Sequence, residues 1–85
     1  MNNTIPASAR PHYARIKAMP CGVCGAPAPS EAHHIVQGQH WTIVPLCPDC
    51  HRGSHNGIHG NRRIWAVKKL DEMTVLNNTI KELLK

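Results

Sequence analysis

Two Cys-x-x-Cys pairs constrain this chain more than any other feature of its sequence. Cys21 and Cys24 form the first pair and Cys47 and Cys50 the second, with residues 25–46 between them. Two residues between cysteines allow both sulfurs to reach one tetrahedral ion at about 2.3 Å. Glycine in the first pair and proline in the second favour the tight turns that this geometry needs. The spacing therefore predicts a closed, structural four-cysteine zinc site, with disulfides or free thiols as the alternatives.

The chain is short enough to need such a site. Its 85 residues fit one domain, and only 4% of them are aromatic, with no phenylalanine. A domain of this size buries roughly 60% of the surface that its unfolded chain exposes, so its core alone gives marginal stability. A bound ion would contribute folding free energy that the core lacks.

The sequence also bounds the compartment. No apolar stretch approaches the roughly 20 residues of a transmembrane helix, and the N-terminus lacks the basic and apolar regions of a signal peptide. We therefore expect an intracellular protein without membrane contacts, in which reduced thiols are available to metal. A secreted protein with two disulfides is the alternative.

The charge favours a polyanionic partner. Ten Lys and Arg against five Asp and Glu give a formal net charge of +5, which in a small domain points first to nucleic acid. Arg52, Arg62 and Arg63 are the candidates for contacts to DNA phosphates, which position a protein without reading sequence. A solvated basic helix face is the alternative for these arginines.

Turn and periodicity signals predict a small α+β domain. We expect residues 1–10 to be a flexible leader and residues 11–85 to form a single domain. Trp65 and the apolar positions of the last helix are expected to pack in the core, and His12 and His40 receive no role. The expected elements are a helix over 11–19, strands over 32–37 and 41–46 with a turn at Gly38, a short helix or turn from Pro48, a helix over 62–70 capped by Asn61, and a helix over 72–85.

Seven histidines are too many for a core of this size, and five of them form two groups. His33 and His34 are adjacent in the first expected strand, whereas His51, His55 and His59 follow the last cysteine at four-residue intervals. A single histidine is more often a surface residue than a ligand. Here the zinc site would fix His51 while the hairpin returns the histidine pair beside it, and neutral imidazoles near arginines suit a divalent ion bound to phosphate.

These motifs resemble a known family of nucleases. The segments Ala32–Ile35 and Val44–Gly53 look like the zinc-stabilised HNH (ββα-metal) nucleases. The run Gly57–Trp65 resembles in particular the phage recombination-enhancement nucleases of the Ref type. The resemblance covers about residues 18–84, and the ordered combination of CxxC, HH, PLCxxCH and a downstream histidine is specific.

The resemblance implies roles for individual histidines. In the family the first residue of the strand pair ligates the catalytic metal, which is His33 here. The second residue is the general base that takes a proton from the attacking water, which is His34. The residue after the last cysteine, His51, ligates the same metal. The downstream ligand corresponds to His59, and His55 remains the alternative because of its four-residue spacing from His51.

The resemblance also implies a fold and an activity. The fold would be a small zinc-stabilised ββα-metal domain, treble-clef-like, with a short hairpin and C-terminal helices. The activity would be metal-dependent endonucleolytic hydrolysis of DNA in phage or prophage recombination or processing, in a bacterial or phage-infected cytoplasm. Structural Zn²⁺ and a catalytic Mg²⁺ or other divalent cation are implied as cofactors. DNA is the implied partner, with a recombinase filament at family level only.

One position departs from the family pattern. The middle HNH residue, usually an asparagine that braces the loop, falls near Thr42, whose hydroxyl could supply a weaker hydrogen bond. Two alternatives to a nuclease therefore remain. One is a non-catalytic, zinc-stabilised DNA-binding module, and the other is a zinc-held protein-interaction domain that uses the C-terminal helix.

Overall fold

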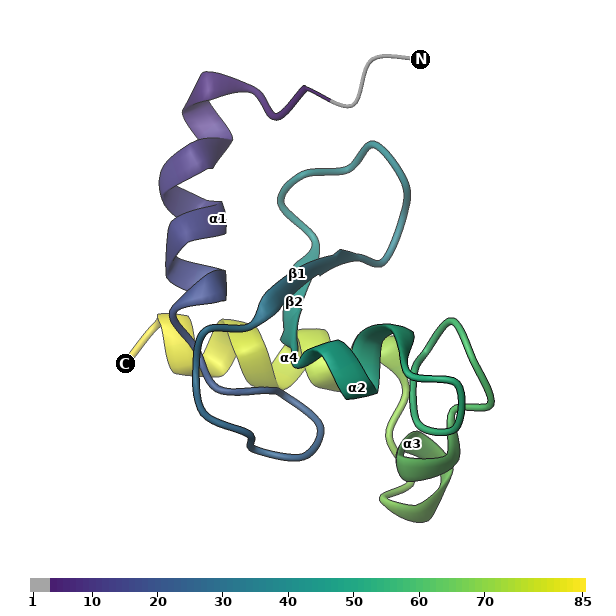
Figure 1. Ribbon diagram of the computed structural model, residues 1–85. Helices are drawn as coiled ribbons and strands as arrows, with labels where there is room; N and C mark the ends of the chain where they lie inside the picture. The colour runs from purple at the N-terminus through teal and green to yellow at the C-terminus, as the bar shows by residue number, and fades with distance from the viewer. Residues whose placement is uncertain (1–3) are drawn as a thin grey trace.

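The computed structural model describes residues 4–85 as a small α+β fold (Figure 1). One antiparallel hairpin lies among short helices, as the turn and periodicity signals predict. Helix α1 runs beside the hairpin, and α4 crosses below it (Figure 1). In chain order the elements are η1 (Ala7–Ala9), α1 (Arg10–Lys17), β1 (Glu31–His34), β2 (Ile43–Leu46), α2 (Pro48–Arg52), α3 (Arg63–Val67) and α4 (Glu72–Leu83).

The register of the hairpin separates the two adjacent histidines. His33 is opposite Val44 and His34 is opposite Ile43, so each histidine shares a face with its partner on β2. Successive residues of a strand point to opposite faces. His33 therefore belongs to the face of Val44, and His34 to the face of Ile43.

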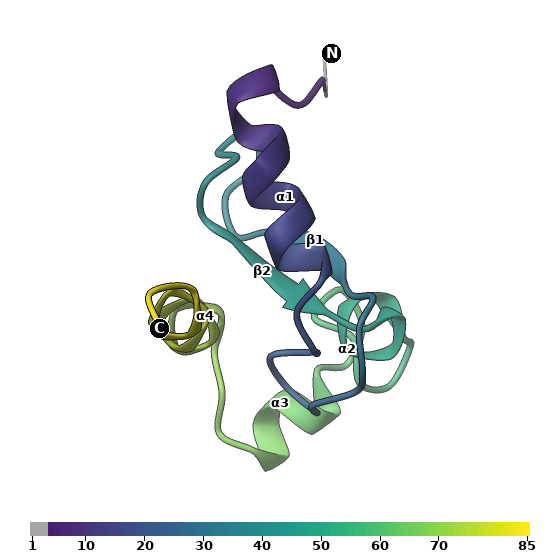
Figure 2. The same cartoon turned by 90° about the vertical axis from the view of Figure 1, so that its left-hand side faces the viewer.

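Strand β2 lies between two apolar cores, and all four of its residues are buried. On one side Val44 and Leu46 pack with three of the four cysteines, Trp65 and residues of α4. On the other side Ile43 packs with residues of η1 and α1. Figure 2 shows the hairpin between α1 and the short helices α2 and α3. The hairpin thus joins the two cores and presents one histidine toward each.

Trp65 lies in the core, which confirms the prediction made for it. Its side chain is 2% exposed, and its indole Nε1–H donates to the Cys50 carbonyl oxygen at 3.1 Å. This bond ties α3 to α2 across the loop that connects them. A buried indole N–H needs a partner, and the C-terminal half of α2 supplies one.

The N-terminal boundary differs from the prediction. Residues 7–10 of the expected leader form η1 and the first residue of α1, and Ala9 is fully buried against Ile16 and Ile43. The reason is that a small apolar side chain at this position completes the core on the α1 side. The ordered chain therefore begins before residue 11, and residues 1–3 of the expected leader lie outside the described residues.

The elements are also shorter than predicted, and one cap is wrong. Asn61 does not cap the helix that follows; Arg62 is its N-terminal flanking residue, with φ 56° and no side-chain cap. The reason lies in the preceding loop, where the Arg62 N–H donates to the Gly57 carbonyl at 3.1 Å. Helix α3 ends early because Lys69 also adopts a left-handed conformation, with φ 55°.

Helix α4 only partly confirms the predicted apolar face. Val75, Leu76 and Thr79 are buried, whereas Ile80 and Leu84 are exposed. One stripe of the helix therefore packs on the hairpin, and the next positions face solvent. None of the helices within residues 4–85 is long and apolar enough to cross a bilayer.

Candidate metal centres

Four sulfur atoms from two distant turns meet at the first centre. The sulfur atoms of the four cysteines all lie within 4.8 Å of one another, and no disulfide joins them. The Cys24 and Cys47 sulfurs are 3.6 Å apart. Sulfurs at 2.3 Å from a tetrahedral ion lie about 3.8 Å from one another, whereas a disulfide needs about 2.05 Å. The four cysteines could therefore hold a metal ion such as zinc.

The surroundings of the sulfurs favour a bound cation. Burial alone would raise the pKa of Cys21, but backbone N–H groups around its sulfur, including that of Val23 at 3.4 Å, lower it to about 7. Burial raises the pKa of both Cys47 and Cys50. Neighbouring thiols that share one buried site cannot all ionise without a positive charge between them. A divalent ion would supply that charge and would make four thiolates, three of them buried, compatible with one site.

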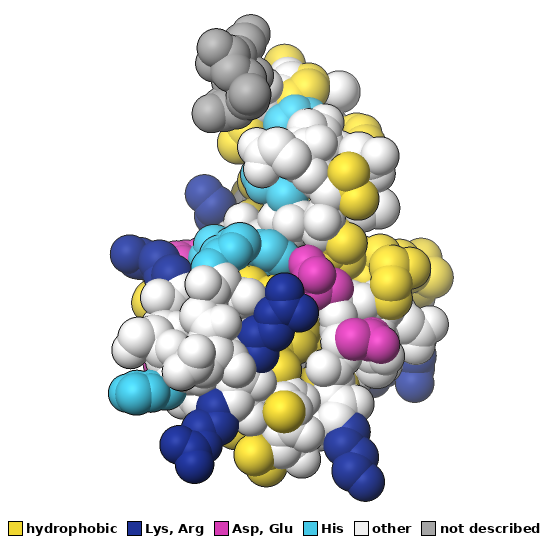
Figure 3. Space-filling model, turned by 90° about the vertical axis from the view of Figure 1, so that its right-hand side faces the viewer, with side chains coloured by type: hydrophobic (Ala, Val, Ile, Leu, Met, Phe, Trp, Pro, Cys, Tyr) yellow, Lys and Arg dark blue, Asp and Glu magenta, His cyan; other side chains and the backbone are white. Residues whose placement is uncertain are grey.

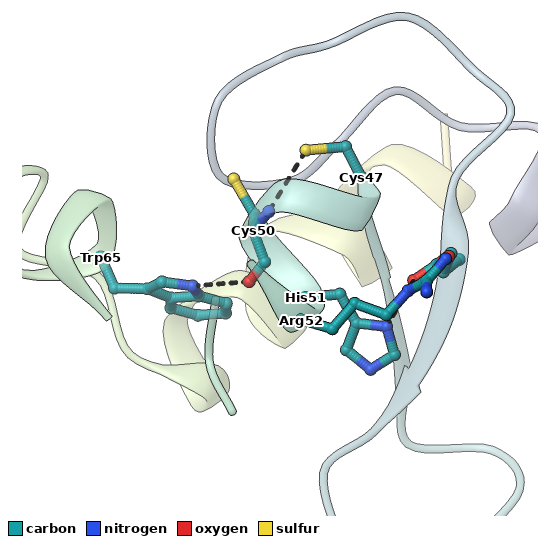
Figure 4. A network of polar contacts seen from close by, with 6 residues as sticks. Cys47, Cys50, His51, Arg52 and Trp65 are labelled. Atoms are coloured by element: carbon teal, nitrogen blue, oxygen red, sulfur yellow. Dashed lines mark hydrogen bonds and ion pairs between the residues drawn. The ribbon is translucent and has the colours of Figure 1, made fainter. Parts of the chain in front are cut away.

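Helix α2 carries both the second cysteine pair and the next residues of interest. Cys47 flanks the start of the helix, and its sulfur accepts the Cys50 N–H at 3.4 Å. Figure 4 shows the two sulfurs on one side of this helix, while His51 and Arg52 extend toward the other. A metal ion on the cysteines would therefore also fix the position of His51.

Three imidazoles meet at the second centre. His33, His51 and His59 each place a ring nitrogen within 4.8 Å of the others, and their ring centroids are 5.0 to 5.1 Å apart. Histidine side chains form a band across this face of the molecule, with basic and acidic groups beside them (Figure 3). His33 is 5% exposed, and burial lowers its pKa more than Glu72 raises it. A neutral, buried imidazole is the form that binds metal.

A tight loop after α2 brings His59 back beside His51. The His59 N–H donates to the His51 carbonyl at 3.3 Å. Glycines permit this return, because a Cβ at either Gly57 or Gly60 would lie 2.5 Å from the Gly53 carbonyl oxygen. Only a residue without a side chain allows the backbone to approach so closely.

The loop does not bring His55 to the same place. His55 is exposed, and it is not part of the cluster formed by His33, His51 and His59. Its carbonyl accepts the Arg63 N–H at 2.9 Å and so holds the start of α3. The geometry therefore offers His59, which the sequence ranks above His55, as the third nitrogen donor.

Two carboxylates orient the histidines of this centre. Glu72, the first residue of α4, places Oε2 2.7 Å from His33 Nε2. Glu31, the first residue of β1, places Oε1 2.8 Å from His51 Nδ1. Arg52 and His51 lower the pKa of Glu31 to about 2, so this carboxylate is ionised near neutral pH. An ionised carboxylate such as that of Glu31 only accepts hydrogen bonds.

These contacts decide which nitrogens can bind an ion. The ring hydrogen must lie on Nε2 of His33 and on Nδ1 of His51, because both nitrogens face carboxylate oxygens. Nδ1 of His33 and Nε2 of His51 then keep the lone pairs that a metal requires. A carboxylate on the remote ring nitrogen is the usual support of a metal-binding histidine.

His34 lies on the opposite face of β1, with different neighbours. Its Nε2 is 2.5 Å from the Tyr13 hydroxyl, which also contacts His40 Nδ1 at 2.7 Å. Burial lowers the pKa of His34, and nearby positive charge on His40 or His51 would lower it further. His34 is therefore neutral at physiological pH, so one of its two ring nitrogens is unprotonated.

Thr42 does not act as a brace for this site. Its hydroxyl oxygen is buried and has no hydrogen-bond partner in the part of the chain that the structure describes. The weaker hydrogen bond that a threonine could supply in place of the family asparagine is therefore missing. The backbone of this residue is paired, since its carbonyl accepts the Ile35 N–H at 3.2 Å.

The three arginines proposed for DNA contacts are exposed but not equivalent. Arg52 donates from Nε and Nη2 to both oxygens of Glu31, with the shortest contact 2.6 Å, so its charge is already paired. Arg62 donates from Nε to the Ile58 carbonyl at 3.0 Å. Across residues 4–85, neither Arg62 nor Arg63 forms an ion pair. Arg62 and Arg63 are thus the freer cations.

The sequence motifs predict no role for four residues of these centres: Tyr13, Glu31, His40 and Glu72. A role for Glu31 could have been predicted, because Glu31 lies two positions before His33 and so shares its face of the strand. The other three contact their histidine partners only through tertiary packing. Sequence periodicity carries no signal for such contacts.

No family model, curated protein or solved structure matches this chain. The chemistry assigned to the protein therefore depends on the two clusters of side chains and on the motifs in its sequence.

We predict that the cysteine site carries one zinc ion on which the fold depends. Chelation of the ion, or Cys50→Ser, should unfold much of the domain, because metal binding and folding share their free energy in small domains. Elemental analysis and far-ultraviolet circular dichroism measure the two quantities. His55→Ala is the control that should retain both. Zinc well below one equivalent in a protein with an intact helical spectrum would contradict the prediction.

We predict a second, weaker metal equivalent at the three histidines. Zinc-loaded protein titrated with Co²⁺ or Mn²⁺ should bind one further ion, and His59→Ala should weaken that step by roughly 10- to 100-fold or more, because a nitrogen donor is lost. Calorimetry or Co²⁺ absorption follows the titration. His55→Ala is the matched control and should bind like wild type. An equal loss of metal affinity in His59→Ala and His55→Ala would show that His59 is not a ligand.

Proposed function

We propose that this protein is a metal-dependent DNA endonuclease of the HNH class. The observation that carries the proposal is the grouping of three imidazoles on one face of β1 with a neutral histidine at the next strand position. A module that only binds DNA needs neither the cluster nor its carboxylate supports. The motif resemblance and the net charge of +5 point in the same direction.

The residues of the second centre fit a divalent ion. His33, His51 and His59 would hold it, and Glu72 and Glu31 would support two of these ligands. Three imidazole donors suit borderline ions such as Zn²⁺, Fe²⁺ or Ni²⁺ better than Mg²⁺, which prefers oxygen ligands. Among the divalent cations that the resemblance implies, the donor set thus favours a borderline ion over Mg²⁺.

The bound ion would act as a Lewis acid for a phosphate oxygen and for the leaving 3′ oxygen. The protein supplies the remaining parts of the hydrolysis. His34 would take the proton of the attacking water, because it is neutral and keeps an unprotonated nitrogen. His33 and His34 are one peptide apart, so the strand itself fixes the distance between the ion-binding group and the base. The resulting hydroxide would attack phosphorus in line, the bond between phosphorus and the 3′ oxygen would break, and the leaving 3′ alkoxide would take a proton from solvent water.

Exposed cations that follow the His59 loop in the chain would hold the DNA backbone. Arg62 and Arg63 lie at the start of α3, directly after the loop that carries His59. Both are exposed and without carboxylate partners among the described residues, so both can contact phosphates. Arg52 would act mainly through Glu31, since its guanidinium already donates to that carboxylate. These contacts position DNA without specifying its sequence.

One observation favours a second candidate, a zinc-stabilised DNA-binding module without catalysis. The hydroxyl of Thr42 makes no hydrogen bond within the described chain, so the position that braces the loop in the family is unused. A site without that brace could retain the fold and the charge while losing activity. The two candidates differ in whether His34 has a function.

We predict that His34→Ala abolishes most cleavage and spares binding. A general base contributes about 10²–10⁴-fold to rate and little to ground-state affinity. Plasmid nicking across a titration of Mn²⁺, Zn²⁺ and Mg²⁺ measures the rate, and DNA affinity is measured without added metal. His33→Ala should instead raise the metal concentration required, with partial rescue by excess Mn²⁺, because it removes a ligand.

His55→Ala is the matched control and should cut like wild type, because its ring lies outside the cluster. If His34→Ala cuts at the wild-type rate, the assignment of the base is wrong. If wild type binds DNA but does not cut it with any divalent metal, the binding module is the correct function.

A further inference from the structure

The hydroxyl of Tyr13 joins two histidines that come from different parts of the chain. It contacts Nε2 of His34, at the end of β1, and Nδ1 of His40, in the loop between the strands. The three rings lie 5.5 to 6.0 Å apart in every pairing. Tyr13 itself is 5% exposed and lies in the core on the α1 side of the hairpin. A buried ring on a helix holds the hydroxyl in one place.

The hydroxyl has one hydrogen, which limits how this chain of bonds can run. Tyr13 must donate to one histidine and accept from the other. If it donates to His40, then His34 donates from Nε2 and keeps a lone pair on Nδ1. If it donates to His34, then Nδ1 of that ring carries the hydrogen and cannot accept a proton. Burial raises the pKa of Tyr13, so the phenol keeps its hydrogen.

Ring chemistry favours the first arrangement. Neutral histidine in water is more stable with its hydrogen on Nε2 than on Nδ1. With Tyr13 donating to His40, both His34 and His40 have this more stable form. The reverse arrangement would place both rings in the less stable form. Within residues 4–85 no hydrogen bond to Nδ1 of His34 opposes this assignment.

The geometry points to Tyr13 as a positioning residue that holds His34 with Nδ1 unprotonated, and to His40 as the acceptor that sets the direction of the bonds. The inference rests on the proposed function in so far as His34 is the base. It also explains how the base is oriented although Thr42 supplies no hydrogen bond. A partner on the remote nitrogen fixes the tautomer and orientation of a catalytic imidazole.

The variants needed for the test differ by single groups. Tyr13→Phe keeps the buried ring and removes only the hydroxyl. His40→Ala removes the acceptor, whereas His40→Asn places an amide oxygen near the former Nδ1 and should substitute for it. His12→Ala is the matched control, because His12 is the neighbouring residue on α1 but stacks on Trp41 instead.

The first measurement needs no cleavage. Ring ¹⁵N shifts of zinc-loaded protein without DNA distinguish protonated from unprotonated nitrogens in His34. Wild type, His12→Ala and His40→Asn should show an unprotonated Nδ1. Tyr13→Phe should show a mixture of the two forms, and His40→Ala should gain the Nδ1–H form. A protonated Nδ1 in wild type, or one unchanged tautomer in every variant, would overturn the inference.

The second measurement separates positioning from folding and binding. In nicking assays Tyr13→Phe and His40→Ala should lower kcat by roughly 10- to 100-fold, with KM and zinc content unchanged. His40→Asn should recover most of the rate. Wild-type rates in both Tyr13→Phe and His40→Ala would overturn the inference without contradicting the nuclease function. If wild type does not cut with any of the metals tested, the nuclease function fails, and the nitrogen shifts alone decide the inference.

Discussion

The convergence of four sulfur atoms is the interaction on which the other parts of this molecule depend. Helix α2 has only five residues and could not hold its place by its own hydrogen bonds. Its first turn is bounded by Cys47 and Cys50, and a metal ion would connect this turn to the Cys21–Cys24 turn, whose sulfurs lie within 4.8 Å of theirs. Trp65 then packs on the same helix and bonds to the Cys50 carbonyl. His51 is therefore positioned by neighbours that take no part in chemistry.

The second centre is built on this support by electrostatics. Glu31 accepts from His51 and from Arg52, and it remains ionised because both donors lower its pKa. Glu72 brings the start of α4 to His33, so the last helix is also tied to the cluster. The same contacts fix the ring tautomers, which gives the packing of α4 a direct effect on metal binding.

The sequence predicts the first centre better than the second. Two Cys-x-x-Cys pairs specify their geometry locally, and the hairpin between them follows from turn residues and β-branched side chains. The contact between His33 and Glu72 joins residues 39 positions apart, and no periodic pattern in the sequence predicts it. The prediction that Asn61 caps α3 is wrong, because the hydrogen bond from the Arg62 N–H to the Gly57 carbonyl overrides the local capping preference of Asn61. The activity itself stays a prediction that rests on motif and geometry.

Anomalous diffraction from crystals grown with zinc and soaked in Mn²⁺ would locate the ions at both centres. We expect a zinc signal among the four cysteine sulfurs and a separate manganese signal within bonding distance of His33, His51 and His59. We also expect Glu72 and Glu31 to keep their contacts to the two histidines in that crystal. Disulfide bonds between the cysteines, or an empty histidine cluster at saturating Mn²⁺, would contradict these expectations.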